Sequence, residues 1–271
     1  YRESLDTHNE ILDSSVHKRE VARTVARGIV YHEIDNAITL SWWSDLWFKT
    51  GLAALVHMKI LDEIFPKWRF LDLFVVQVQQ DCLRVDTNFA MKPLSYEVRT
   101  PSEIKSLFSF PIYIKGYYRV RYDYTSLKAI TDYLKHKEYE KIHVINRAQI
   151  IDDTYYFFMK GEVTYDMFAY LIYYLRQERD YVAWYPMFQI FRDLSRFLPF
   201  EESEPLTKDM RFILQGLLEN LTYNEKVDED DLTKWLRREV VKWACIFGDT
   251  DCEEIAHSRL EKHLNDPTNH K

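Results

Sequence analysis

The residues that come nearest to a catalytic pattern are His32 and Glu33, which open the sequence His-Glu-Ile-Asp-Asn. On a helix, a His-Glu-x-x-His pattern presents two imidazoles as zinc ligands and places the glutamate as a general base. Asn36 stands where the second histidine is required, and no two of the nine histidines lie four residues apart. We therefore interpret His32 and Glu33 as ordinary polar residues of a helix, with metal binding as the alternative.

Two other groupings contain residues that could do chemistry. Cys252 and His257 lie close in sequence, but a single Cys and a single His are more often structural than a nucleophile and its base. Asp152 and Asp153 could act as paired carboxylates, yet their place in a helix rich in Tyr and Phe favours a structural role. The sequence has no phosphate-binding glycine loop and no nucleophile elbow.

The spacing of apolar residues predicts the helices that must position these groups. N-cap candidates at residues 13–15 precede a helix expected over residues 16–34. A second helix is expected over residues 44–65, where Pro66 ends it. Two more are expected over residues 68–85 and 102–108.

Residues 112–122 (IYIKGYYRVRY) are rich in β-branched and aromatic types and predict a strand. Amphipathic helices with short polar connectors are expected after it, over residues 125–136, 146–160, 165–176, 181–197, 208–221, 228–247 and 251–264. Such a succession favours stacked antiparallel helix pairs, as in an α-solenoid or an irregular bundle. The change of composition near Gly116 predicts a domain boundary.

Composition and charge exclude several classes of protein. A chain of 271 residues that is 46% hydrophobic can bury one large core or two modest ones, and its 6 Gly and 8 Pro favour a mostly helical fold. The net charge of −7 and the pI near 5.8 argue against nucleic-acid binding. No apolar run approaches the roughly 20 residues of a membrane helix. Because the chain begins with Tyr1 and has no signal peptide, we expect it to be part of a longer sequence.

The three cysteines are too few for a disulfide scaffold, although a bridge between Cys245 and Cys252 remains possible. Asn220 opens an N-glycosylation sequon, Asn-Leu-Thr, which has meaning only outside the cytosol.

Residues 25–55 resemble the zinc-binding core of the aminopeptidase N family. Members carry HELAHQWFGN, then a tryptophan pair, then DLWLNEGFA, and this chain reads RGIVYHEIDNAITLSWWSDLWFKTGLAALV. Residues 42–47 (WWSDLW) fix the register without a gap. In that register Arg27 and Tyr31 stand where the two zinc histidines belong. Gly28 replaces the catalytic glutamate, and Thr50 replaces the third ligand.

These replacements remove the chemistry that the family needs. Arg27 cannot be deprotonated and puts a fixed positive charge where a dication belongs, and Gly28 has no side chain. Neutral Tyr31 and Thr50 are poor zinc ligands. The resemblance therefore implies a protein that has lost zinc and peptidase activity and serves a binding or structural role. The alternative is a functional zinc-dependent aminopeptidase that acts on peptide N-termini through a shifted or partner-completed site.

The resemblance continues beyond this core. Tyr113 belongs to a YxKG segment whose tyrosine stabilises the tetrahedral intermediate in active members, although it can equally be an aromatic residue of the strand. Residues 116–123 resemble GYYRVNYD, which opens the family's helical C-terminal domain, and residues 143–153 resemble its NRAQLIDD segment. Cys245 and Cys252 resemble the WAC…DC pair of that domain, which implies a disulfide.

The resemblance implies a mostly α chain in two parts. Residues 1–115 are expected to form the helical half of a thermolysin-like catalytic domain, partial and degenerate. Residues 116–271 are expected to form part of an α-superhelical, HEAT-like C-terminal domain, with one short strand region at the junction. The rest of the catalytic domain, a β-sandwich, the N-terminal β-domain and the GxMEN motif are missing. Either the gene product is shortened or distant pieces of a gene have been joined.

Family members are commonly ectoenzymes, so the resemblance also implies an extracellular or cell-surface location. Membrane contact is then expected only through an anchor that this chain lacks. The expected ligand is a peptide or a protein, with no zinc cofactor.

Overall fold

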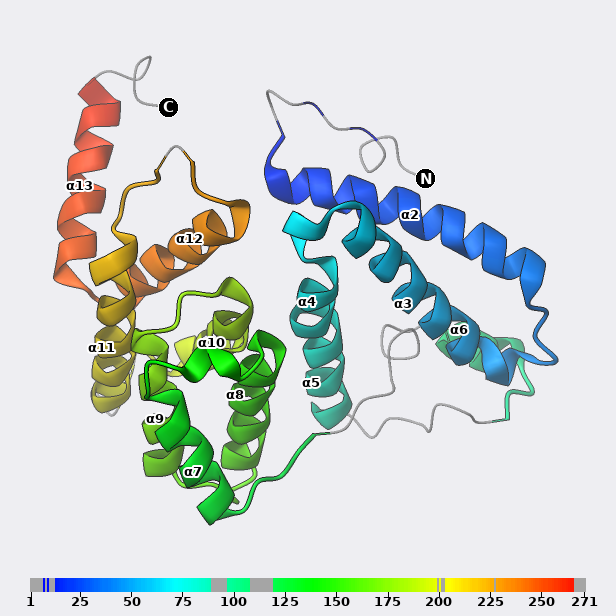
Figure 1. Cartoon of the computed structure of the whole chain (residues 1–271), viewed down its shortest axis with the longest axis horizontal. Coiled ribbons are helices and arrows are strands. Elements are labelled where there is room, and N and C mark those ends of the chain that lie inside the picture. Colours follow the sequence, from blue (N-terminus) through cyan, green and yellow to red (C-terminus); the bar gives the residue numbers. More distant parts are fainter. Residues whose placement is uncertain are drawn as a thin grey trace. The chain divides into compact units, whose positions relative to one another are not determined.

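The computed structural model describes residues 7, 9, 13–88, 97–107, 119–198, 200, 203–226 and 228–265 (Figure 1). Within these residues all regular secondary structure is helical, which confirms the mostly α fold class. The chain divides into two compact units, Tyr1–Arg119 and Val120–Lys271. The predicted boundary at Gly116 lies outside the described residues.

The first unit is built on two long helices, α2 (Ser15–Ala37) and α3 (Leu46–Ile64), which pack against each other. Ser14 is the N-cap of α2, and its hydroxyl accepts a hydrogen bond from the His17 amide. α3 ends just before Pro66, as its sequence predicts. Shorter helices complete the described part of this unit: α4 (Phe70–Phe74), α5 (Gln80–Asn88) and α6 (Pro101–Leu107).

A π-helical turn interrupts the helix predicted over residues 68–85. It spans Val75–Gln79, between α4 and α5. Gln80, which follows it, is fully buried, and its side-chain amide has no hydrogen-bond partner among the described residues. π-turns insert one extra residue into a helix and are rare, so the apolar periodicity gives no sign of them.

The second unit is a succession of helices that pack as neighbours, with α8 against α10 and α11 against α12 (Figure 1). Its helices are α7 (Tyr124–Leu134), α8 (Val144–Met159), α9 (Tyr165–Ile172), α10 (Tyr181–Leu194), α11 (Glu204–Leu221), α12 (Asp231–Ile246) and α13 (Thr250–Asn265). The core is rich in aromatic side chains, among which Phe168, Trp184 and Phe191 are at most 1% exposed. Each of these helices overlaps one predicted from the sequence.

The strand predicted over residues 112–122 is wrong for the part that the structure describes. Residues 119–122 form no strand. The Val120 amide donates to Asp153 Oδ2 at 2.9 Å. A buried carboxylate therefore accepts the hydrogen bond that a backbone carbonyl of a neighbouring strand would accept in a sheet. Residues 112–118 lie outside the described residues.

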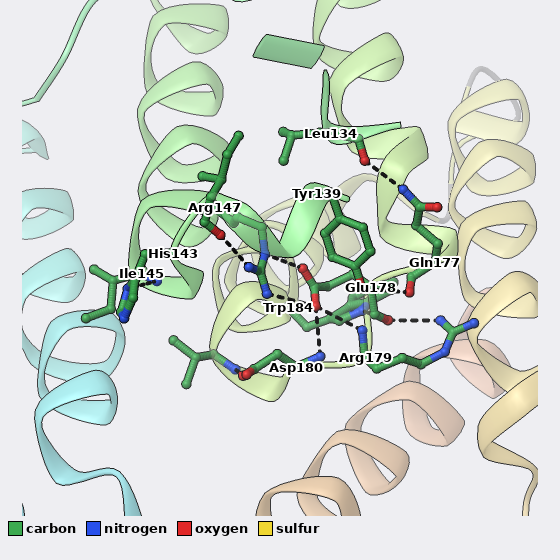
Figure 2. A network of polar contacts seen from close by, with 12 residues as sticks. Leu134, Tyr139, His143, Ile145, Arg147, Gln177, Glu178, Arg179, Asp180 and Trp184 are labelled. Atoms are coloured by element: carbon green, nitrogen blue, oxygen red, sulfur yellow. Dashed lines mark hydrogen bonds and ion pairs between the residues drawn. The ribbon is translucent and has the colours of Figure 1, made fainter. Parts of the chain in front are cut away.

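A buried ion pair ties α8 to the segment before α10 (Figure 2). Arg147 Nε lies 2.7 Å from Glu178 Oε2, and its Nη2 lies 3.3 Å from Oε1. The two side chains are 6% and 1% exposed. Glu178 Oε1 also accepts the amides of Arg179 and Asp180, at 2.9 and 3.0 Å. These bonds offset the cost of taking both charges out of water.

A disulfide joins Cys245, near the end of α12, to Cys252 in α13, with Cα atoms 5.3 Å apart. Gly248, in the connecting turn, has φ +75°, which favours glycine. Asp249 accepts the Cys252 amide at 3.1 Å and the Tyr223 hydroxyl at 3.1 Å. The bridge therefore closes a short loop that is already held by side-chain contacts.

We expect Glu178→Gln to lower the free energy of unfolding by about 3 kcal/mol, because it leaves the Arg147 guanidinium buried without a countercharge. Urea denaturation followed by circular dichroism measures the change. The control, Glu138→Gln, removes the same charge from an ion pair with Lys141 whose side chains are both 66% exposed, and should have no measurable effect. Equal losses in the two variants would contradict this role for the buried pair.

We expect a reducing agent to lower the Tm of the wild-type chain, because opening a loop of this length costs about 2 kcal/mol. The double variant Cys245→Ser/Cys252→Ser should start at the lower Tm and show no response to the reductant. Differential scanning calorimetry with and without reductant makes the comparison. A reductant response of equal size in the double variant would show that this disulfide is not its source.

Candidate functional site

The four positions that the resemblance aligns with the family's zinc ligands and general base fall on two packed helices. Arg27, Gly28 and Tyr31 lie on α2, and Thr50 lies on α3. Arg27 and Tyr31 are four residues apart, so they share one face of α2. Together with Thr50 they line an open pocket of about 610 Å³. The structure thus brings three of these four positions to one pocket.

The loop between α2 and α3 forms another wall of this pocket, which we call the Arg27 pocket. Residues 38–43 line it, and the Trp42 and Trp43 side chains are 53% and 42% exposed. Trp42 Nε1 donates to the Val98 carbonyl at 2.9 Å, which fixes the indole although half of it is open to solvent. The pocket is therefore lined by both charged and aromatic side chains.

Arg27 is an exposed cation that lines the pocket. Its Cζ lies 5.4 Å from the centroid of the Tyr31 ring, within the range of a cation–π contact. Such a contact at an exposed position contributes only about 0.5–1 kcal/mol. It orients the guanidinium and leaves its charge uncompensated.

The charged neighbours of Arg27 are paired with each other. Lys49 Nζ lies 2.5 Å from Asp35 Oδ1, across the two helices. Arg23 Nη1 lies 2.7 Å from Glu20 Oε1, along α2. In the described part of the chain no carboxylate pairs with Arg27. The local charges therefore cancel except for one guanidinium.

The Thr50 side chain is 3% exposed and engaged with its own helix. Its hydroxyl lies 2.9 Å from the Leu46 carbonyl and 3.2 Å from the Trp47 carbonyl, and donates to them. A hydroxyl whose proton is held by backbone carbonyls is not available as an anionic ligand.

These side chains do not fit zinc. A catalytic zinc site needs three protein donors with free lone pairs, and Arg27 offers only N–H groups and a permanent charge. Across the described ranges, no three His, Cys, Asp or Glu side chains come together in a way that could hold a metal ion. What this pocket offers chemically is a guanidinium, a phenol and two indole rings.

A second, smaller pocket of about 220 Å³ shares Arg27 and Tyr31 with the first and adds His57 from α3. The His57 Nδ1 lies 2.8 Å from the Ala53 carbonyl. Because a carbonyl only accepts, Nδ1 carries the proton and Nε2 is the free nitrogen of the neutral ring. Burial lowers the pKa of His57 despite this hydrogen bond, and the charges of Arg23 and Arg27 lower it further.

Sequence reasoning missed His57, although a signal existed. His57 lies seven residues after Thr50, two helical turns along α3, so both face the same side. The ion pair between Asp35 and Lys49 was missed as well, because it joins residues on different helices.

The shifted pattern at His32 and Glu33 points away from both pockets. Both side chains are exposed on α2, and neither lines either pocket. The His32 Nε2 lies 3.5 Å from the Asn36 amide nitrogen, which stands in the place of a second ligand.

The remaining catalytic candidates have structural partners. Asp153 is fully buried and accepts from the Val120 amide and from Gln149 Nε2, at 2.9 and 2.7 Å. Cys252 is held in the disulfide, which removes the thiol that a nucleophile requires. His257 is exposed, 3.7 Å from Glu261.

Two further predicted residues have other roles: Tyr113 is expected to stabilise the tetrahedral intermediate, and Asn220 to carry an N-linked glycan. Tyr113 lies outside the described residues. Asn220 is exposed in the last turn of α11, and its side-chain nitrogen lies 3.4 Å from the Gly216 carbonyl. None of the helices described here combines the length and the apolar character that crossing a membrane requires.

Two family models match the chain and together cover nearly all of it. Residues 2–149 match the peptidase family M1 domain, and residues 114–270 match the ERAP1-like C-terminal domain. Each match spans more than half of the 271 residues. The overlap of the two matches contains the junction at residues 115–116 that the sequence motifs indicate.

Individual relatives are similar over shorter stretches. The chain is 32% identical over 154 residues to aminopeptidase N of Plutella xylostella, which covers 56% of this chain and 16% of that protein. It is 34% identical over 104 residues to leucyl aminopeptidase of Saccharolobus solfataricus, covering 38% and 13%. It is 34% identical over 119 residues to aminopeptidase N of Oryctolagus cuniculus, covering 43% and 12%.

The matched stretches thus span only 12–16% of the length of these relatives. The two family models nevertheless agree on one assignment. The chain belongs to the aminopeptidase N family of M1 peptidases.

Proposed function

We propose that this chain is an aminopeptidase N-like protein without catalytic zinc or peptidase activity, and that it serves as a binding or structural module. The observation that carries the proposal is Arg27, which stands at the family's first zinc position and lines a pocket with Tyr31 and Thr50. Peptide or protein ligands are the partners that fit such a module.

The size of the electrostatic effect supports the loss of zinc. A unit charge about 4 Å from a dication is repelled by about 8 kcal/mol at an effective dielectric constant of about 20, twice the value for two unit charges. Structural zinc sites with all their ligands gain about 10–16 kcal/mol. When three donors are lost and this repulsion is added, the net binding free energy is no longer sufficient to hold a zinc ion.

The loss of the general base supports the loss of activity independently. A base must lie within about 2.6–3.2 Å of the water that it deprotonates, and Gly28 has no side chain to reach that far. His57 lines the second pocket, but burial and two guanidiniums lower its pKa, which weakens it as a base.

The alternative is a zinc-dependent aminopeptidase that acts through a shifted or partner-completed site. This alternative is supported by the similarity to relatives that are named as aminopeptidases. His32 and Glu33 would have to supply the chemistry, and their exposure on α2 gives no enclosed site.

The test is metal content and hydrolysis measured on the same sample. After metal-free purification and dialysis against zinc, we expect well under 0.1 zinc ion per chain by atomic emission and no cleavage of alanyl or leucyl anilides. One zinc per chain with chelator-sensitive cleavage would overturn the proposal. If that cleavage disappeared in His32→Ala or Glu33→Gln, the shifted site would be the correct one.

We also propose that the protein resides outside the cytosol, at the cell surface or secreted. The disulfide between Cys245 and Cys252 and the exposed Asn220 sequon support this location. Expressed through a eukaryotic secretory pathway, the chain should lose mass on treatment with an N-glycosidase, and Asn220→Gln should show no such loss. A wild-type chain that stays unglycosylated would contradict the use of this sequon.

A further inference from the structure

Arg27 and Tyr31 line both the Arg27 pocket and the smaller pocket that contains His57. One pocket is small, about 220 Å³, and is lined by His57 and by apolar residues of α3 and α4, and the other is larger, about 610 Å³, and is lined by Trp42 and Trp43. A ligand that placed a charged group at Arg27 would therefore have room for an apolar group against the indole rings.

We propose that the Arg27 pocket binds a free carboxylate carried by an apolar amino acid or peptide. This inference rests on the proposed function, since a bound zinc ion would occupy the position of the guanidinium. The chain would thus bind its ligand through a carboxylate, whereas an aminopeptidase engages the amino terminus of a peptide.

The charge balance favours an anion of a single charge. Of the cations around the two pockets, Arg23 is paired with Glu20 and Lys49 is paired with Asp35. Arg27 is the cation of this group that has no carboxylate among the described residues. A carboxylate therefore matches the single uncompensated charge, and a guanidinium can engage it through two parallel hydrogen bonds. A dianionic phosphate would leave a charge unmatched near Asp35.

The rim of the pocket selects for an apolar group beside the carboxylate. Trp42 and Trp43 present large exposed side chains. Leu46, the first residue of α3, lines the same pocket. Exposed aromatic residues next to one charged group are typical of ligand sites, where they bury the apolar part of the ligand.

The pKa of His57 can be measured independently of ligand affinity. It responds to the charge of Arg27 because both residues line the smaller pocket. The charged groups that face it are Glu20, Arg23 and Arg27, all from α2, while α4 and the π-turn contribute the apolar Phe74 and Val78. Burial is the main cause of the lowered pKa of His57, and the charges of Arg23 and Arg27 lower it further. A carboxylate bound to Arg27 would offset that charge and raise the pKa of the imidazole. By linkage, the ligand then binds more tightly as the pH falls toward the pKa of His57.

The experiment is a calorimetric and NMR titration of the full chain with N-acetyl-L-leucine, which has a carboxylate and an apolar side chain but no free amine. The neutral N-acetyl-L-leucinamide and the cationic L-leucinamide are the comparison probes. We expect the acid to bind at least about tenfold more tightly than either amide, since a hydrogen bond to a charged group contributes about that factor. We also expect the His57 imidazole pKa to rise on binding of the acid. An acetylated dipeptide amide ending in aspartate tests whether a side-chain carboxylate binds as well as an α-carboxylate.

The variant Arg27→Gln should weaken binding of the acid by about tenfold or more. The matched control is Lys59→Gln, which removes one positive charge from an exposed position of α3 away from both pockets and should change the affinity less than twofold. Equal affinity of acid and amides in the wild-type chain would overturn the inference. So would equal losses in the two variants, or binding of inorganic phosphate as tight as that of the acid.

The same samples are assayed for zinc and for anilide cleavage, so that the two proposals can fail separately. A zinc-free, inactive chain that does not bind the acid overturns only this inference. A zinc-loaded, active chain overturns the proposed function as well.

Discussion

The close packing of α2 against α3 is the constraint on which the candidate site depends. Ala22 and Ala26 on α2 and Ala54 on α3 are small enough to let the two helices approach, and they pack against a buried cluster that includes Met58. Arg27 directly follows Ala26 and lines both pockets together with residues of α3. Larger side chains at the alanine positions would separate the helices and alter both pockets.

The buried guanidiniums of the second unit and the exposed Arg27 are stabilised differently. In the second unit Arg147 and Arg237 are buried, and each has a carboxylate partner, Glu178 and Glu229 respectively. Burying an unpaired guanidinium would cost several kcal/mol, so these ion pairs are a condition of the packing. Arg27 is exposed, so it can remain without a carboxylate partner among the described residues. That freedom makes its charge available to a ligand.

Much of the fold and of the candidate site could be predicted from local sequence patterns and from the register that the family resemblance sets at residues 42–47. Apolar periodicity located the helices, and the tryptophan-rich residues 42–47 placed residues 27, 31 and 50 at one site. Features that arise from tertiary packing could not be predicted in this way. The π-turn before the buried Gln80, the place of His57 in the second pocket and the Asp35–Lys49 pair across two helices are of this kind. The strand predicted near residue 120 failed because Asp153 takes up the Val120 amide.

The central claim is that the scaffold of a zinc site survives and only its side chains have changed. The most direct test is the zinc dependence of the Tm in the wild-type chain and in Arg27→His/Gly28→Glu/Tyr31→His/Thr50→Glu. At a zinc concentration 100 times Kd, the restored variant should gain about 2.7 kcal/mol, a shift of several degrees, and the wild type should not respond. A zinc-induced shift in the wild type, or none in a folded restored variant, would contradict the account.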